Sequence, residues 1–268
     1  MIEWFQTFYV IIAAAIIGGA GIGTLGAYVV GMRIPFIAIV ISHAAMLGGV
    51  LAYLLKWPAF PVSLFIAILG ALLLGKSMKS KSRGESTVQL SILFSLLIGL
   101  TFLAMGLVRH DMTPVLSLMW GSLLFVKPGD LIIMCVVTAI LFIFAWIFHR
   151  ELKAILFSRR LAESSGIPAG WITAALIGIT AGMITASLDI VGGLLIYSLL
   201  TCPAAAAYKM GSNLKSIIFL SGLFGIMAAA GGFFISWETN LPTGSCITLT
   251  AVSLYGMVHL WRIRYPIG

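Results

Sequence analysis

The sequence carries very little charge for its length. Of 268 residues, 9% are charged and 61% are hydrophobic, and the mean hydropathy is +1.13. A soluble domain is usually about 25% charged, so this chain has too few polar residues to cover a globule in water. The same hydrophobicity excludes intrinsic disorder. The composition therefore indicates an integral membrane protein.

Cysteine and catalytic motifs are also scarce. Cys135, Cys202 and Cys246 form an odd set on apolar segments, which predicts small packing residues and neither a disulfide framework nor a metal cluster. The sequence contains no HExxH or CxxC, no Ser-His-Asp order and no paired catalytic carboxylates, which argues against an enzyme. The first apolar run follows no basic region and precedes no small-residue cleavage site, so we expect it to be a retained span.

Long apolar runs dominate the chain, many of them near the roughly 20 residues that cross a bilayer. The segment 111–126 is too short to cross and predicts a half-helix at one face. The expected fold is one all-α domain over 1–268, a bundle of eight or nine transmembrane helices, because no polar stretch is long enough to fold alone. The predicted spans are 8–31, 34–55, 58–75, 88–108, 131–148, 169–187, 188–208, 214–236 and 243–261.

The basic residues predict the orientation. The net charge is +8, but the Lys and Arg residues lie in short breaks between apolar runs, which favours a topological role over nucleic-acid binding. Thirteen lie in breaks on one side, which includes 76–83, 149–163 and the C-terminal tail, and Lys56, Arg109 and Lys127 lie on the other. We therefore expect the first side and the C-terminus in the cytoplasm, and the N-terminus outside.

Two glycine motifs have simple explanations. Gly19–Gly23 and Gly178–Gly182 have the spacing that lets helices approach closely in lipid, and ordinary packing within the bundle is favoured over a dimer interface. Gly70-Ala-Leu-Leu-Leu-Gly-Lys-Ser77 matches the phosphate-binding loop pattern, but it ends an apolar span and lacks a strand–loop–helix context. We therefore do not expect this chain to bind ATP.

Ionisable residues inside spans are costly and are functional candidates. His43 lies about 13 Å into its helix, near the bilayer centre, between small residues. Two interpretations of His43 remain, a ligand that contacts a metal ion and a structural histidine that is hydrogen-bonded to a neighbouring helix. Asp189 is the only carboxylate deep in an apolar stretch, and it would either meet a cation or cap a helix broken near Ser187 and Gly192–Gly193. Imidazole and carboxylate together suit zinc, manganese or ferrous iron.

Other candidates lie at the membrane surfaces. His110 and Asp111 form a pair at the outer mouth that suggests a metal-entry role, although a solvated loop is favoured. His149 and His259 lie at the cytoplasmic interface without an acidic neighbour and are expected to be structural. The segment 149–168 mixes charge with a helical apolar rhythm, which predicts short interfacial helices that serve as a surface loop or as a docking platform.

Four stretches carry a family resemblance, in order, between about residues 25 and 255: GMRIP…SHAAMLG from Gly31 to Gly48, LMWGSLLFVKPGDL over 118–131, VGGLLIYSLLTCPAAAA over 191–207, and LPTG over 241–244. Together they resemble the membrane permease subunits of bacterial ABC importers for manganese, zinc and iron. The resemblance implies a homodimer in the plasma membrane, two cytoplasmic ATPase subunits that hydrolyse ATP, and an extracytoplasmic metal-binding protein. The metal would be cargo, with no permanently bound cofactor.

The resemblance also implies roles for single residues. His43 matches the family's early histidine and would contact the metal in the translocation path. The stretch that contains Arg160, Ala162, Glu163 and Gly166 would contact the ATPase. One position departs from the family: four residues before His43 it usually carries an aspartate, and this chain has Ile39. The loss of that oxygen ligand leaves open an importer of a metal chelate or other small nutrient on the same scaffold. A rival of a different class is an ion-coupled secondary transporter that uses Asp189 as its coupling carboxylate.

Overall fold

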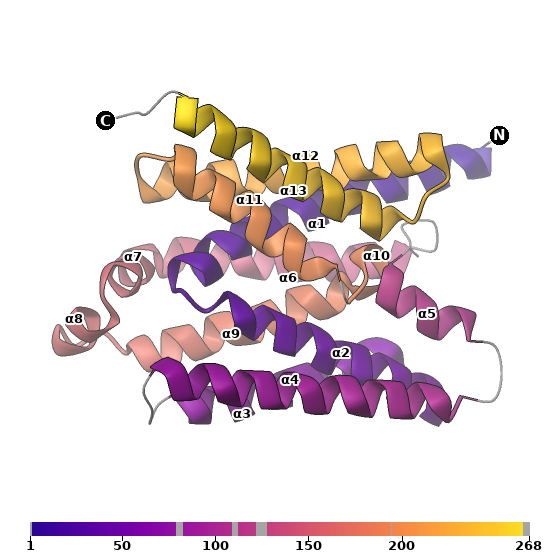
Figure 1. The fold of residues 1–268 in the computed structure, drawn as a ribbon, viewed down its shortest axis with the longest axis horizontal. Coiled ribbons are helices and arrows are strands. Elements are labelled where there is room, and N and C mark those ends of the chain that lie inside the picture. The colour runs from indigo at the N-terminus through magenta and orange to yellow at the C-terminus, as the bar shows by residue number, and fades with distance from the viewer. Residues whose placement is uncertain (1, 79–82, 109–111, 122–127, 194, 265–268) are drawn as a thin grey trace.

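The computed structural model describes residues 2–78, 83–108, 112–121, 128–193 and 195–264, and in these residues it contains helices and no strands (Figure 1). The helices are α1 (Ile2–Gly31), α2 (Pro35–Leu55), α3 (Ala59–Met78), α4 (Arg83–Gly106), α5 (Thr113–Trp120), α6 (Pro128–Ile147), α7 (His149–Phe157), α8 (Arg159–Ser164), α9 (Ala169–Ala186), α10 (Leu188–Val191), α11 (Ile196–Met210), α12 (Leu214–Thr239) and α13 (Thr243–Arg264).

The helices confirm the predicted all-α membrane fold. Seven of the described helices are long and apolar enough to cross a bilayer, namely α1, α2, α4, α6, α9, α12 and α13. Helix α3 contributes a shorter apolar segment over Ala59–Leu73, and α11 contributes 15 residues. The predicted half-helix within 111–126 is α5, which has eight residues.

One predicted span was wrong at its beginning. The segment 188–208 was expected to be a single helix, but the chain forms the short α10, breaks, and resumes as α11 at Ile196. Gly192 adopts φ 87°, a left-handed conformation that ends a right-handed helix and that glycine accepts without strain. The glycine pair, which sequence analysis had considered as a break, therefore divides this span.

Close helix contacts hold the bundle together. Helix α1 packs along α12, where a Cβ atom on Gly19 would lie 2.6 Å from the carbonyl oxygen of Gly225 and one on Gly23 would lie 2.3 Å from that of Ser221. Only glycine permits this separation. The Gly19–Gly23 motif therefore serves packing within the chain, as predicted. The second motif does not bring backbones together, because a Cβ on Gly178 would meet no atom within 4 Å.

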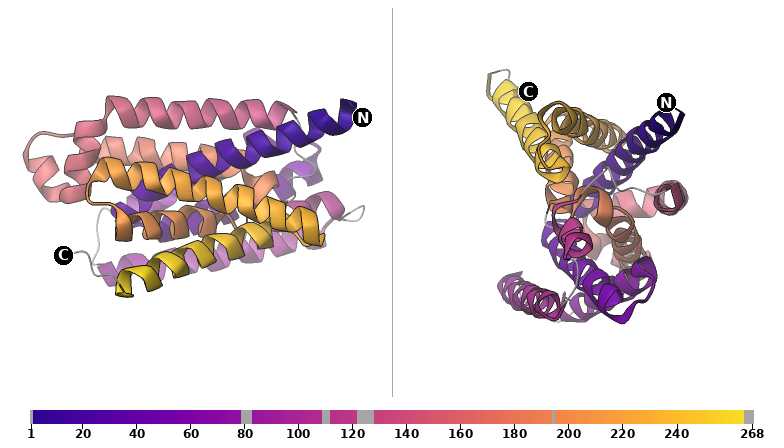
Figure 2. Two further views of the ribbon diagram at one scale, coloured as in Figure 1. Left: turned by 90° about the horizontal axis from the view of Figure 1, so that it is seen from above. Right: turned by 90° about the vertical axis from the view of Figure 1, so that its right-hand side faces the viewer.

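The two ends of the bundle are distinct. The long helices run along one direction; Figure 2 shows them lengthwise in its left view and end-on in its right view. Helices α7 and α8 and the C-terminal end of α13 lie at one end, and α5 and the N-terminal end of α1 lie at the other (Figure 1). Residues 70–77, which match the phosphate-binding pattern, lie inside helix α3 and form no loop.

Candidate functional site

His43 lies in the most enclosed helix of the bundle. Helix α2 packs against α3, α4 and α9, and its His43 side chain is only 5% exposed. The ring Nδ1 lies 2.8 Å from the carbonyl oxygen of Ile39, one helical turn earlier. The ring of Phe94 in α4 meets the imidazole edge-on, with 4.8 Å between centroids. These contacts fix the orientation of the imidazole.

The hydrogen bond at Nδ1 determines which nitrogen is available for a ligand. A carbonyl oxygen only accepts, so Nδ1 carries the proton, and in the neutral ring Nε2 keeps its lone pair. Nε2 is buried and has no hydrogen-bond partner in the described part of the chain. A histidine whose Nδ1–H is held by a backbone carbonyl while Nε2 is unoccupied has the usual arrangement of a metal ligand.

The neighbour of His43 connects α2 to the broken helix. The Ser42 hydroxyl donates a hydrogen bond to the carbonyl oxygen of Gly193, directly after α10. A Cβ atom on Gly193 would lie 3.3 Å from the sulfur of Met46, one turn further along α2. Asp189 belongs to α10, which packs beside α2, but its side chain lies outside the described atoms. The fold thus brings together the elements that carry both predicted path residues.

Three glycines form a backbone junction beside this break. A Cβ atom on Gly121, after α5, would lie 2.5 Å from the backbone nitrogen of Gly192, and one on Gly244, in α13, would lie 2.5 Å from the carbonyl oxygen of Val191. The Gly193 amide donates to the carbonyl oxygen of Leu118 at 2.8 Å. Each of these glycines belongs to one of the stretches that carried the family resemblance, and their meeting point explains why those stretches contain glycine.

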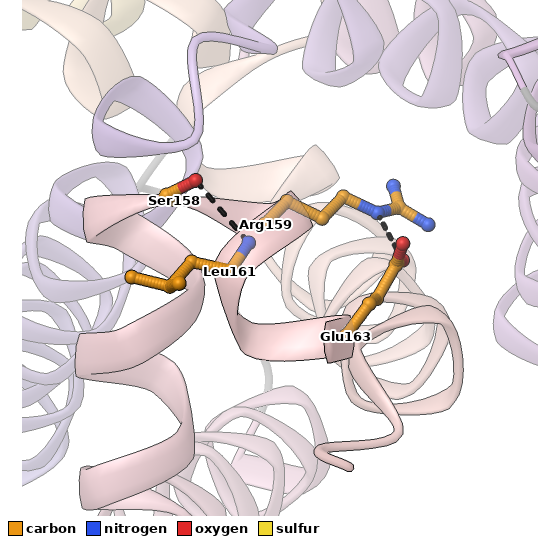
Figure 3. A network of polar contacts seen from close by, with 4 residues as sticks. All are labelled: Ser158, Arg159, Leu161 and Glu163. Atoms are coloured by element: carbon orange, nitrogen blue, oxygen red, sulfur yellow. Dashed lines mark hydrogen bonds and ion pairs between the residues drawn. The ribbon is translucent and has the colours of Figure 1, made fainter. Parts of the chain in front are cut away.

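The segment 149–168 forms two short helices at the opposite end of the bundle, as predicted. The Ser158 hydroxyl accepts a hydrogen bond from the Leu161 amide at 3.4 Å and caps α8, and Arg159 Nε lies 2.9 Å from Glu163 Oε1 (Figure 3). The buried Ala162 holds α8 against the rest of the chain, whereas Phe157 is 84% exposed.

The predicted coupling residues therefore differ in accessibility. Arg160, Glu163 and Gly166 are exposed and available to a partner, and Ala162 is buried at 1% exposure. Gly166 has φ 81°, and its amide donates to the carbonyl oxygen of Glu163 at 3.1 Å. Glycine at this position allows the turn that separates α8 from α9.

The remaining candidates are less informative. His110 and Asp111 lie outside the described residues. His259 stacks on Tyr255, with ring centroids 5.9 Å apart. In the described part of the chain, no three residues among His, Cys, Asp and Glu lie close enough to hold a metal ion. Sequence analysis missed Phe94, since a phenylalanine in an apolar span carries no signal that separates it from other core residues.

Comparisons with known proteins cover nearly the whole chain. The ABC 3 transport family matches residues 5–262. The manganese transport system membrane protein MntC of Halalkalibacterium halodurans is 25% identical over 93% of this chain and 85% of its own. The high-affinity zinc uptake system membrane protein ZnuB of Buchnera aphidicola is 27% identical over 90% of this chain and 92% of its own. The solved structure of PsaBC from Streptococcus pneumoniae in complex with Fab superposes with a TM-score of 0.85 at 28% identity, covering 96% of this chain and 95% of the matched chain.

Proposed function

Because the chain belongs to the ABC 3 transport family, we propose that it is the membrane permease subunit of an ATP-driven importer that carries a divalent transition metal ion into the cell. The observation that carries this proposal is the family match over residues 5–262, which includes every helix of the bundle apart from chain ends. The manganese and zinc systems named among its relatives support a transition metal as cargo. This membership favours ATP-driven import over an ion-coupled secondary transporter.

The geometry supports a role for His43 in the path. Its unpartnered Nε2 is buried within α2, and a neutral imidazole nitrogen binds zinc, manganese and iron. Asp189, on the adjacent α10, would supply the oxygen ligand that Ile39 does not. A path needs weak sites that a cargo ion can leave, so few ligands at each point are sufficient.

The conformational change driven by ATP hydrolysis would be transmitted to this chain through α7 and α8, at one end of the bundle. ATP hydrolysis would take place on cytoplasmic ATPase subunits, which would contact the exposed Phe157, Arg160, Glu163 and Gly166. A second copy of the chain would complete the path, and an extracytoplasmic metal-binding protein would deliver the ion to the opposite end. The chain would lie in the plasma membrane with α7, α8 and the C-terminus in the cytoplasm.

A metal chelate is the second candidate cargo. Ile39 places an apolar side chain one turn before His43, at the position where the family usually carries an aspartate. A metal ion carried as a chelate would keep most of the ligands that the chelator supplies, so it would need few ligands from residues of the translocation path.

Uptake by intact cells distinguishes these cargoes. The chain would be expressed with the products of its neighbouring genes, and accumulation of zinc, manganese and ferrous iron would be measured with and without a chelate competitor, for wild type and Asp189→Asn. Saturable uptake of a free ion that falls in Asp189→Asn is expected. Uptake of the chelate alone would favour the second candidate, and uptake of neither would contradict the proposal.

A further inference from the structure

A groove opens on the side of the bundle between α6 and α12. Both helices pack against α1, whose buried Thr24 and Tyr28 line its floor. Its volume is about 750 Å³. The walls are apolar and include the exposed Phe142 and Phe219. We name this feature the α1–α6–α12 groove; apolar side chains at this depth face lipid tails and not water.

The charged groups of the groove lie together at one end, where α6 ends and α12 begins. Arg150, Glu151 and Lys215 line that end together with His149, and Trp146, which is 82% exposed, lies in the last turn of α6. Tryptophan is enriched where the bilayer meets water. The groove therefore has an apolar body at the depth of the acyl chains and a charged end at the depth of the headgroups.

The three charged groups lack partners in the described part of the chain. The ion pair found there joins Arg159 to Glu163 and involves none of them. Glu151 Oε2 is buried and accepts no hydrogen bond from a described residue. An enclosed carboxylate oxygen without a donor is unfavourable, so Glu151 favours a ligand that supplies an N–H or O–H donor, and a cationic donor most of all.

We propose that the α1–α6–α12 groove binds one phosphatidylethanolamine molecule from the leaflet on the α7–α8 side. Its phosphate would accept hydrogen bonds from Arg150 and Lys215, its ammonium group would donate to Glu151, and its acyl chains would lie against the apolar walls. The arrangement of two cations and one carboxylate complements a zwitterionic headgroup with N–H donors. A purely anionic headgroup would place its charge beside Glu151, and a choline headgroup has no N–H to donate. This site is separate from the proposed metal path and does not depend on it.

Native mass spectrometry of the full chain in mild detergent tests this site. The purified protein would be titrated separately with dioleoyl phosphatidylethanolamine, phosphatidylcholine and phosphatidylglycerol. We expect one ethanolamine lipid per chain, bound about tenfold more tightly than the choline lipid, as one charge-assisted hydrogen bond predicts. This comparison requires no variant, so it does not depend on how a substitution affects folding.

Variants then assign the contacts. Glu151→Gln is expected to lower ethanolamine binding to the level of choline, and Arg150→Gln with Lys215→Gln is expected to weaken binding of all three lipids. Glu238→Gln and Lys56→Gln are matched controls, since both residues are exposed and lie at the other end of the bundle. Equal binding of choline and ethanolamine lipids, a preference for the glycerol lipid that persists in Glu151→Gln, or a second copy that closes the groove to all three would overturn the proposal.

Discussion

At the scale of single residues, His43 is the side chain whose geometry most favours the proposed metal contact. Its Nδ1 is held 2.8 Å from the carbonyl oxygen of Ile39, and Phe94 packs against its ring. The free Nε2 could bind a passing ion, and no other described group satisfies it. A purely structural histidine in so enclosed a place would be expected to use both nitrogens.

Replacement of His43 tests this role directly. His43→Ala is expected to lower metal uptake at least about tenfold, as loss of one metal-ligand or orienting group typically does, while the protein still inserts and remains monodisperse. Uptake kinetics and size-exclusion profiles would be measured together. His259→Ala is the control, because His259 stacks on Tyr255 in α13, away from α2; equal uptake in both variants would contradict the assignment.

At the scale of elements, the break between α10 and α11 depends on three glycines. Gly192 has φ 87°, and a Cβ atom there would lie 2.5 Å from the backbone nitrogen of Gly121 and 2.5 Å from the carbonyl oxygen of Met119. Gly244 in α13 packs against the same break, where a Cβ atom on it would lie 2.5 Å from the carbonyl oxygen of Val191. The Ser42 hydroxyl then connects this junction to the helix that carries His43. The position of the broken helix beside α2 is therefore set by backbone contacts that a side chain would prevent.

Gly192→Ala is expected to abolish accumulation of folded protein, because the new Cβ meets backbone atoms that cannot move away and the positive φ adds strain. Gly178→Ala serves as the control, since its Cβ would meet no atom within 4 Å. Yield and thermal stability after detergent extraction measure the effect. Normal yield of Gly192→Ala would show that the junction is not needed for folding.

The α7–α8 element presents an exposed aromatic residue at the end of the bundle. Phe157→Ala and Arg160→Glu are expected to reduce copurification of the ATPase subunit with the tagged chain, because both side chains are exposed beside the capped α8. Trp146→Ala is the matched control, being 82% exposed against 84% for Phe157 but within the spanning helix α6. Unchanged copurification of the first two variants would exclude this face as the ATPase contact.

The sequence determines the elements better than it determines their contacts. Apolar run length locates the spanning helices because a bilayer requires it, and the mixed pattern of 149–168 correctly predicts α7 and α8. The prediction of 188–208 as one continuous span was wrong, because the glycines that break it are equally compatible with a packed continuous helix. The contact of Phe94 with His43 depends on how α4 packs on α2, and no local pattern encodes that packing.

At the scale of the whole molecule, the distribution of charge and the positions of the ends agree. Thirteen of the sixteen Lys and Arg residues were assigned by sequence to one side, and the breaks that follow α1 and α6 and the end of α13 lie at the same end of the bundle (Figure 1). The N-terminal end of α1 lies at the other end. This arrangement predicts an odd number of crossings, which nine spans would give.

Reporter fusions test the orientation. A green fluorescent protein fused after Arg264 is expected to fluoresce, and alkaline phosphatase inserted between α12 and α13 near Asn240 is expected to be active, because basic residues favour the cytoplasmic side. Phosphatase inserted after Gly211 is the internal control and is expected to be inactive. The opposite pattern at all three positions would show that the molecule has the inverse orientation, with α7 and α8 outside the cell.

ATP-dependent metal uptake by the reconstituted transporter tests the central claim most directly. The chain and its ATPase partner would be placed in proteoliposomes with the binding protein outside and ATP inside, and entry of zinc and manganese would be followed over time. Uptake that requires hydrolysable ATP and both membrane-associated subunits, and that is lost in His43→Ala, is the predicted result. Metal entry through this chain alone, without ATP or the partner, would contradict the account.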